Sequence, residues 1–243
     1  MRIPIDLGPL EIADLLEARA DDDDVAAAAY EAFGRSVFPF EGVFLDPEAS
    51  ARGSLSELLR EPDVPVARLR TWAPPFCCAL RDLGSPVADA VADSLASLLS
   101  GPAEEAGELV RLRGRSPDLG DPSVGVNELV DWLCTPVRCG MFLSSPVLER
   151  LGRELNVPRG FGSRRRLLTN LLRAGAQYGR ADRVVDGLRG VVERHRGVLG
   201  GAVWRTGVLR AASEPWCERL AETSVRLAEA EHRLELAAQR LPA

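Results

Sequence analysis

The chain contains no lysine and only two histidines, His195 and His232, so all 30 of its basic residues are arginine. Without lysine there is neither a Schiff-base lysine nor the lysine of a phosphate-binding loop. Both histidines lie in charged helical stretches, "VVERHRGV" and "EAEHRLEL", and we expect them on exposed helix faces rather than beside a nucleophile. We therefore predict no catalytic residues and a protein that is not an enzyme.

The five cysteines form no C-x-x-C pair, because Cys77 and Cys78 are adjacent and Cys134 and Cys139 are five positions apart. These spacings do not match a zinc site, and buried free thiols are the ordinary alternative. An odd number of cysteines without a regular framework favours a reducing compartment. We predict no metal site and no cofactor.

Long apolar runs and a positive net charge are also absent. No run approaches the roughly 20 residues that a membrane helix needs, and acidic residues interrupt the N-terminal stretch before it could form the apolar core of a signal peptide. The net charge of -6 and the pI of about 5.2 disfavour a general nucleic-acid binder. We expect a cytoplasmic protein with no nucleic-acid or membrane partner.

The sequence lacks alternating β-branched runs, and almost every periodic stretch has helical spacing. We predict an all-α protein, a single helical-bundle domain over residues 1–243 with about nine to eleven helices. A stretch rich in Gly, Pro, Ser and Asp over 113–125 is a candidate sub-domain hinge.

Prolines and serines predict where individual helices begin and end. Pro74 and Pro75 are expected to end one helix near Trp72 and to start another at Phe76. Pro136 is expected to bend or break the apolar helix that contains it. "SSPVLERLGRELNVP" predicts a helix with Ser145 as its N-cap, followed by a proline in the first turn, as "SPVADAVADSLASLLSG" does earlier in the chain.

"GSRRRLL" places three arginines, Arg164 to Arg166, at the start of a helix, where they oppose the helix dipole. One interpretation is that these arginines bind a phosphate group or a cluster of acidic residues. The other, which we favour at this point, is a set of salt bridges to neighbouring acidic helices.

"SVFPFEGVFLDPE" gathers three phenylalanines in a segment that is a poor helix former because of Pro39 and Gly42. A helical protein without catalytic residues is usually a binder, and binding energy concentrates in aromatic anchors ringed by polar groups. We expect this aromatic loop and the Trp72–Phe76 segment to line a groove. The alternative is that Phe40 and Phe44 pack the loop onto the helix that ends at Phe33.

The same two segments resemble the TorD/DmsD family of redox-enzyme maturation chaperones. "AYEAFGRSVFPFEGVFLD" is similar to the family's early helix end and its P-[YF]-E-S-V-[YF]-L motif, with Gly42 where serine is common. "TWAPPFCCALRDLGSPVADAVADSLASLL" looks like the family's W-x-P-x-F helix pair. "REPDVPV" is similar to its E-P-x-D-H loop, although the histidine is missing. The resemblance covers about residues 25–100.

The resemblance implies an all-α, TorD-like cytoplasmic chaperone. It would bind the twin-arginine signal peptide and the apoprotein of a molybdenum-cofactor oxidoreductase of the DMSO reductase type, and assist cofactor insertion before export. The partner is that enzyme's catalytic subunit with its leader peptide, and the chaperone is a monomer or a helix-exchanged dimer. A groove of aromatic and acidic side chains would complement a basic, apolar leader; its residues are Phe38, Phe40, Glu41, Phe44, Glu61, Asp63, Trp72 and Phe76.

Two other classes stay open. One is a small helical enzyme with a thiol or metal site near Cys134, Cys139 and Cys77. The other is a generic helical adaptor.

Overall fold

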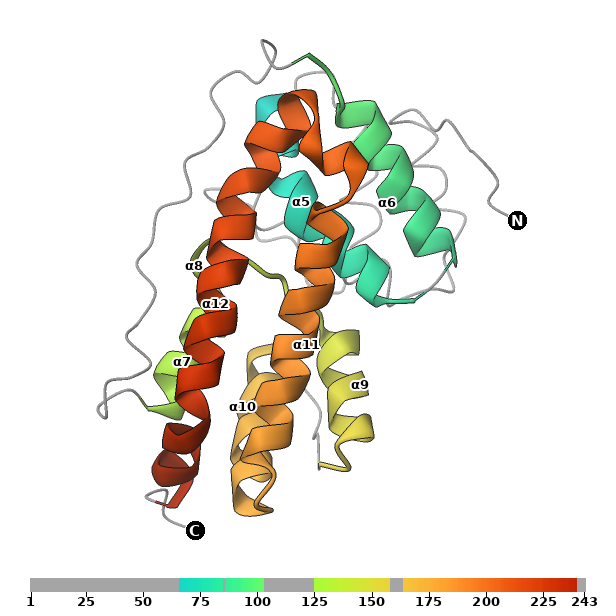
Figure 1. The fold of residues 1–243 in the computed structure, drawn as a ribbon. Helices are drawn as coiled ribbons and strands as arrows, with labels where there is room; N and C mark the ends of the chain where they lie inside the picture. Colours follow the sequence, from blue (N-terminus) through green and yellow to red (C-terminus); the bar gives the residue numbers. More distant parts are fainter. Residues whose placement is uncertain (1–65, 85, 103–124, 158–163, 240–243) are drawn as a thin grey trace, which may run out of the picture. The chain divides into compact units, whose positions relative to one another are not determined.

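The computed structural model describes residues 66–84, 86–102, 125–157 and 164–239, with some side chains in these ranges left out (Figure 1). Within them the chain forms eight α-helices, one 3-10 helix and no strand. This confirms the all-α prediction for the described residues, while the helix number of the whole chain and the TorD-like fold stay predictions. The elements are α5 Val66–Asp82, α6 Pro86–Leu99, α7 Val126–Leu133, α8 Pro136–Cys139, α9 Ser145–Glu154, α10 Arg164–Gln177, α11 Ala181–Leu199, η3 Ala202–Arg205 and α12 Gly207–Gln239.

The chain divides into two compact units, which we describe separately. Unit 1 comprises Met1–Arg111 and Leu199–Glu214, and unit 2 comprises Leu112–Val198 and Pro215–Ala243. Of the described elements, α5, α6, η3 and the beginning of α12 belong to unit 1. The others, with most of α11 and the remainder of α12, belong to unit 2. Of the proposed hinge over 113–125 only Gly125 lies in the described residues, so that hinge stays a prediction.

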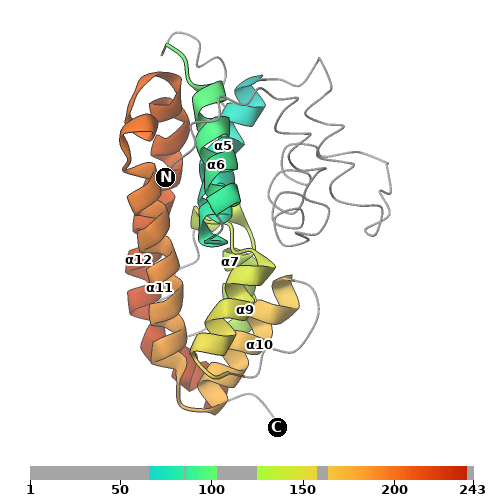
Figure 2. The same cartoon turned by 90° about the vertical axis from the view of Figure 1, so that its right-hand side faces the viewer.

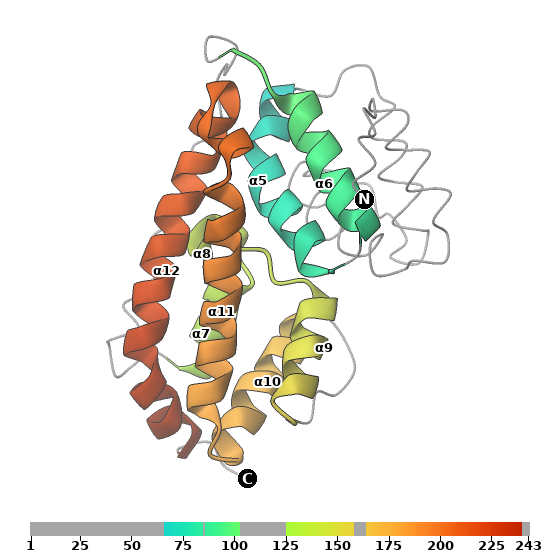
Figure 3. The ribbon, with the colours of Figure 1, turned by 45° about the vertical axis from the view of Figure 1, so that its right-hand side comes forward.

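The core of unit 1 forms where α5 packs against α6 (Figure 3). Ala88, Ala92 and Ala96 are buried and recur every four residues, so they form one face of α6 along which another helix can approach closely. On α5, Cys77 faces this side of α6, and its thiol donates to the Ala92 carbonyl at 3.5 Å. Phe76 and Leu80 of α5 are also buried.

The expectation that Pro74 and Pro75 separate two helices is wrong, because α5 continues through both of them. The two rings remove the amide donors that would bond to the carbonyls one turn earlier, and a proline inside a helix costs about 3 kcal/mol. Every residue from Ala73 to Leu80 with a described side chain is buried. Fully burying a large apolar side chain contributes roughly 1.5–3 kcal/mol, so the buried side chains of this segment together offset the cost of the prolines.

Unit 1 also holds a close backbone approach at the start of α12. Gly207 has φ +51°, and a Cβ there would collide with the carbonyl oxygen of Gly101. The next amide, of Val208, donates to that same carbonyl at 3.1 Å. Glycine is required at this position both for its conformation and for its lack of a side chain.

In unit 2 the predicted break at Pro136 is confirmed, since α7 ends at Leu133 and the short α8 begins at Pro136. Gly140 follows with φ +77° and ends α8, and the residues from Met141 to Ser144 are buried without being helical. Helix α9 has Ser144, not Ser145, as its N-cap, so the predicted cap was one residue late. Adjacent serines are equally good caps in sequence, and the extended backbone of Ser144 decides between them.

Helix α10 packs on α7 and on α9 (Figure 2). Helices α11 and α12 lie side by side in all three ribbon views, and the Ser224 hydroxyl of α12 donates to Glu193 of α11 at 2.9 Å. Arg180, at the start of α11, donates to the carbonyls of Leu155 and Asn156, which close the end of α9. Unit 2 is therefore connected by hydrogen bonds between its helices as well as by its apolar core.

The expectation that His195 is exposed is wrong, since its side chain is 1% exposed. Its sequence neighbours are charged and exposed, but Val191 and Val192, four and three residues earlier, are fully buried. Residues at these spacings share one helix face, so the periodicity is the better guide here. The His232 side chain lies outside the described residues.

Candidate functional site

Two of the predicted peptide-binding residues lie on a described helix. Trp72 and Phe76 both belong to α5, and Phe76 is 4% exposed. Phe76 therefore contributes to the core of unit 1, and its role in binding a peptide stays a prediction. The remaining predicted residues lie outside the described residues; they are Phe38, Phe40, Glu41, Phe44, Glu61 and Asp63.

The cysteines have no disulfide, and three of them, Cys77, Cys78 and Cys139, are buried. Burial raises the pKa of the Cys77 thiol, and likewise of the Cys139 thiol, from 9.0 to about 12. Both thiols are therefore protonated at neutral pH and are poor nucleophiles or metal ligands in this state. Among the described residues no group of three or more His, Cys, Asp and Glu side chains is placed to hold a metal ion.

No specific observation favours the enzyme alternative. Cys77 belongs to unit 1, whereas Cys134 and Cys139 belong to unit 2. Cys134 is half-buried, and metal analysis of the purified protein together with Cys134→Ser would test a site built on it.

A polar arrangement that the sequence only partly indicated lies at the start of α10. Arg164 donates from Nη2 to the Cys134 carbonyl at 2.8 Å, and its Cζ lies 4.5 Å from the centroid of the Phe142 ring. A hydrogen bond to a carbonyl just beyond the end of α7 and a cation–π contact with an aromatic ring therefore hold the guanidinium in place. We call Arg164, Cys134 and Phe142 the Arg164 cluster.

Several buried donor atoms of unit 2 have no hydrogen-bond partner in the described part of the chain. They are Nη1 of Arg164, the hydroxyl of Ser144 and Nε1 of Trp132. Ser144 is completely buried and Trp132 is 1% exposed. Sequence reasoning singled out the three arginines but missed Ser144 and Trp132, because no pattern marks a serine or a tryptophan as lacking a partner.

The interpretation that Arg164 to Arg166 form salt bridges is confirmed for Arg165. Arg165 pairs with Asp131 on α7. No ion pair joins Arg164 to a carboxylate of the described residues, and Arg166 is exposed. The three arginines that look equivalent in sequence are thus in three different environments.

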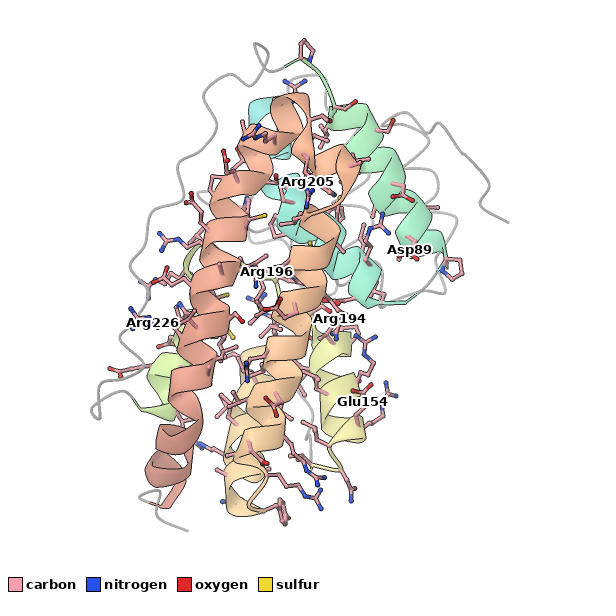
Figure 4. All side chains as sticks on the ribbon, viewed as in Figure 1. Asp89, Glu154, Arg194, Arg196, Arg205 and Arg226 are labelled. Carbon is pink, nitrogen blue, oxygen red and sulfur yellow. The ribbon has the colours of Figure 1, made fainter. Side chains whose placement is uncertain are left out.

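Charged side chains elsewhere stand on exposed helix faces, as Arg194 and Arg196 do on α11 (Figure 4). Arg196 pairs with Glu193 at 3.0 Å within the same helix. The hydrogen bond from the Ser224 hydroxyl, followed by that from Arg196, lowers the pKa of Glu193. Exposed pairs of this kind contribute little to stability.

The two units differ in charge. Unit 1 contains 11 arginines and 22 acidic residues, and unit 2 contains 19 arginines and 14 acidic residues. Their formal net charges are therefore -11 and +5, which together make the -6 of the whole chain. The acidic balance of the protein belongs entirely to unit 1.

The described residues define a helical protein whose most unusual polar feature is the Arg164 cluster in unit 2. No helix among them is both long and apolar enough to cross a membrane. Scans of the chain against protein-family models, curated proteins and solved structures found no match.

Proposed function

We propose that this protein is a cytoplasmic maturation chaperone of the TorD/DmsD type. It binds the twin-arginine leader peptide and apoprotein of a molybdenum-cofactor oxidoreductase and assists cofactor insertion before export. The observation that carries the proposal is the aromatic and acidic motif Pro39–Leu45, followed by the W-x-P-x-F segment at residues 72–76. That second segment lies on α5, which packs against α6, and this helix pair supports the resemblance of Thr71–Leu99 to the family's helix pair.

The charge of unit 1 supports the same function. A leader with two arginines is basic at its start and apolar in its middle. A unit of net charge -11 attracts such a peptide over a distance, and aromatic side chains can then bind its apolar part. Glu41 lies between Phe40 and Phe44 in sequence, so one short loop offers both kinds of group.

The proposal is tested by calorimetry with a synthetic leader peptide that carries both arginines and an apolar middle. We expect binding in the micromolar range or tighter, which corresponds to about -8 kcal/mol. Phe40→Ala and Glu41→Lys should each weaken binding without unfolding the protein, and replacement of both peptide arginines by glutamine should abolish it. Added salt should weaken the interaction because it screens the charges.

Glu149→Lys provides the matched control, since it makes the same charge change at an exposed residue of α9 in unit 2. It should leave peptide binding nearly unchanged. If Glu149→Lys weakens binding as much as Glu41→Lys does, the net charge of the chain and not the aromatic loop attracts the peptide. If the intact leader does not bind at all, the proposed function is wrong.

A further inference from the structure

Helix α10 carries positive charge without a single carboxylate. Its sequence, RRRLLTNLLRAGAQ, contains four arginines, and its first turn has none of the acidic residues that the helix dipole favours there. The excess of arginine extends to the neighbouring elements. From Pro136, which begins α8, to Arg180, which precedes α11, the chain contains nine arginines and two glutamates, a formal charge of +7. Because the whole chain has -6, its other residues together carry -13.

Two arginines of α10, Arg166 and Arg173, lie on its exposed face. They are seven residues apart, which is almost two helical turns, so they lie on the same side of the helix, about 10 Å apart along its axis. Asn170 and Gln177 continue this side and are polar but uncharged. We call Arg166, Asn170, Arg173 and Gln177 the α10 face. The opposite side of the helix is apolar and buried; its residues include Leu167, Leu168, Leu171 and Leu172.

Neither arginine of the α10 face is neutralised within the part of the chain that the structure describes. Arg165 pairs with Asp131 of α7, and on α9 Arg150 pairs with Glu154. No ion pair or hydrogen bond joins the side chain of Arg166 or of Arg173 to another described residue, and both side chains are exposed. Their charge is therefore available to a group from outside these residues.

The chemistry of the α10 face selects a partner with several carboxylates. A guanidinium can donate two parallel hydrogen bonds to one carboxylate, and the amides of Asn170 and Gln177 can also donate. The -13 elsewhere in the chain repels an extended polyanion, such as a nucleic acid or an anionic membrane, more than it repels a short acidic segment. The chain itself contains such a segment. Residues 11–24 include seven carboxylates and one arginine, and they end in the four consecutive aspartates Asp21–Asp24.

We propose that the α10 face binds the acidic segment Asp21–Asp24 of a second copy of this chain. The two sides of the contact differ, since α10 belongs to unit 2 and the acidic segment belongs to unit 1, so the copies associate head to tail. Exposed ion pairs are individually weak, so the association is reversible and depends on protein concentration and salt. It does not depend on the peptide-binding function proposed above.

The first test is sedimentation velocity of the full-length protein at increasing concentration. At an ionic strength of about 0.01 M, where charges act over about 30 Å, we expect the mean mass to rise above the 26.3 kDa of one chain. At about 1 M salt it should return to that of one chain. Replacing both Arg166 and Arg173 by glutamate should abolish the association. Replacing Arg183 and Arg205, two exposed arginines outside α10, by glutamate makes the same charge change and should retain it.

A mixing experiment tests whether the contact is head to tail. The variant with Asp21–Asp24 replaced by asparagine keeps the α10 face, and the variant with Arg166→Glu and Arg173→Glu keeps the acidic segment. Each variant alone should stay monomeric. An equal mixture should form a 1:1 dimer and nothing larger, because only one contact is then possible. Formation of this dimer also shows that both variants are folded.

Several outcomes would overturn the proposal. A wild-type protein that stays monomeric at low salt has no such contact. Association that survives high salt, or that the Arg166→Glu, Arg173→Glu variant retains, uses another surface. Equal loss in the Arg183→Glu, Arg205→Glu control would implicate net charge alone, and a mixture without a dimer would exclude the acidic segment as the partner of α10. Leader-peptide binding should be normal in the Arg166→Glu, Arg173→Glu variant, so the two proposals fail separately.

Discussion

Unit 1 and unit 2 each contain an arginine that donates to a carbonyl at a helix end, but the surroundings of the two arginines differ. In unit 1, Arg70 donates from Nε to the carbonyl of Leu99, the last residue of α6, at 3.1 Å. In unit 2, Arg164 donates to the Cys134 carbonyl just beyond α7 at 2.8 Å. Both arginines satisfy a carbonyl at a helix end, where a cation is favourable. Only Arg164 also leaves a buried guanidinium nitrogen without a described acceptor.

The two units also differ in their net charge. Unit 1 is acidic and carries the motif that resembles a peptide-binding chaperone, whereas unit 2 is basic and carries the Arg164 cluster. A single net charge of -6 conceals this difference. The comparison teaches that charge is distributed unevenly between the two units, which the composition of the whole chain does not reveal.

The largest expected contrast between the units is in thiol reactivity. Both cysteines of unit 1 are buried, whereas Cys134 and Cys217 of unit 2 are half-buried. With the pKa of Cys77 raised from 9.0 to about 12, its thiolate fraction at neutral pH falls about a thousandfold. Maleimide labelling of the native protein, read by peptide mass spectrometry, should modify Cys134 and Cys217 first. Equal labelling of Cys77 would contradict the burial in unit 1.

The next contrast concerns glycines with positive φ. Gly140→Ala in unit 2 would place a Cβ 2.6–2.9 Å from atoms of Arg219 and Leu220, and Gly207→Ala in unit 1 would meet the Gly101 carbonyl. Each should lower the free energy of unfolding by about 3 kcal/mol or more, since strain and overpacking add. Urea unfolding measures the loss, and hydrogen exchange assigns it to a unit.

Each of these glycines has a matched control. Gly179 in unit 2 and Gly84 in unit 1 also have positive φ, but nothing lies within 4 Å of a Cβ there. Alanine at these positions should lower the free energy of unfolding by only about 1–2 kcal/mol, because only the positive φ is unfavourable there. If control and test variants lose the same free energy, the close approaches do not contribute.

A smaller effect is expected for buried hydroxyl groups. In unit 2 the Thr223 hydroxyl donates to the Cys139 carbonyl at 2.6 Å, and in unit 1 the Ser213 hydroxyl donates to the Trp204 carbonyl at 3.0 Å. Thr223→Val and Ser213→Ala should each destabilise the protein by about 1–2 kcal/mol, because a buried carbonyl loses its donor. Thr169→Val, which removes an exposed bond of the same type, should stay within about 0.5 kcal/mol of wild type.

The smallest effect is electrostatic and belongs to unit 2. The pKa of Glu193 is lowered in the folded protein, so this carboxylate contributes stability above its unfolded pKa, and the contribution is lost as the pH falls through the folded pKa. Ser224→Ala should move the pKa of Glu193 back up toward 4.5, measured by NMR titration. The accompanying change in acid stability should be slight because the group is exposed. An unchanged pKa would show that the Ser224 hydrogen bond does not form in solution.

Local sequence patterns predicted part of this structure well. The helical periodicity predicted an all-α chain, and Pro136 predicted the break between α7 and α8, because proline fits the first turn of a helix but not its interior. At Pro74 and Pro75 the same rule failed, since buried packing around α5 offset the cost. His195 is buried because it shares a helix face with Val191 and Val192, although its neighbours in sequence are charged.

The candidate functional residues could likewise be predicted from the sequence only in part. The aromatic loop was found from composition and motif alone, and its residues stay predictions because they lie outside the described residues. The Arg164 cluster was visible in sequence only as three consecutive arginines. The burial of the Ser144 and Trp132 donors could not be predicted, because whether a donor is buried and finds an acceptor depends on which helices meet it.

The sequence by itself determined the helical class in the described residues, the absence of lysine and the presence of only two histidines, because spacing and residue type are local properties. Only the tertiary structure decided that Arg164, Arg165 and Arg166 differ, that His195 is buried and that Gly140 and Gly207 admit no side chain. These facts depend on contacts between segments far apart in the chain, such as that of residue 140 with residues 219 and 220. Burial and partnership are set by such contacts, and no local pattern encodes them.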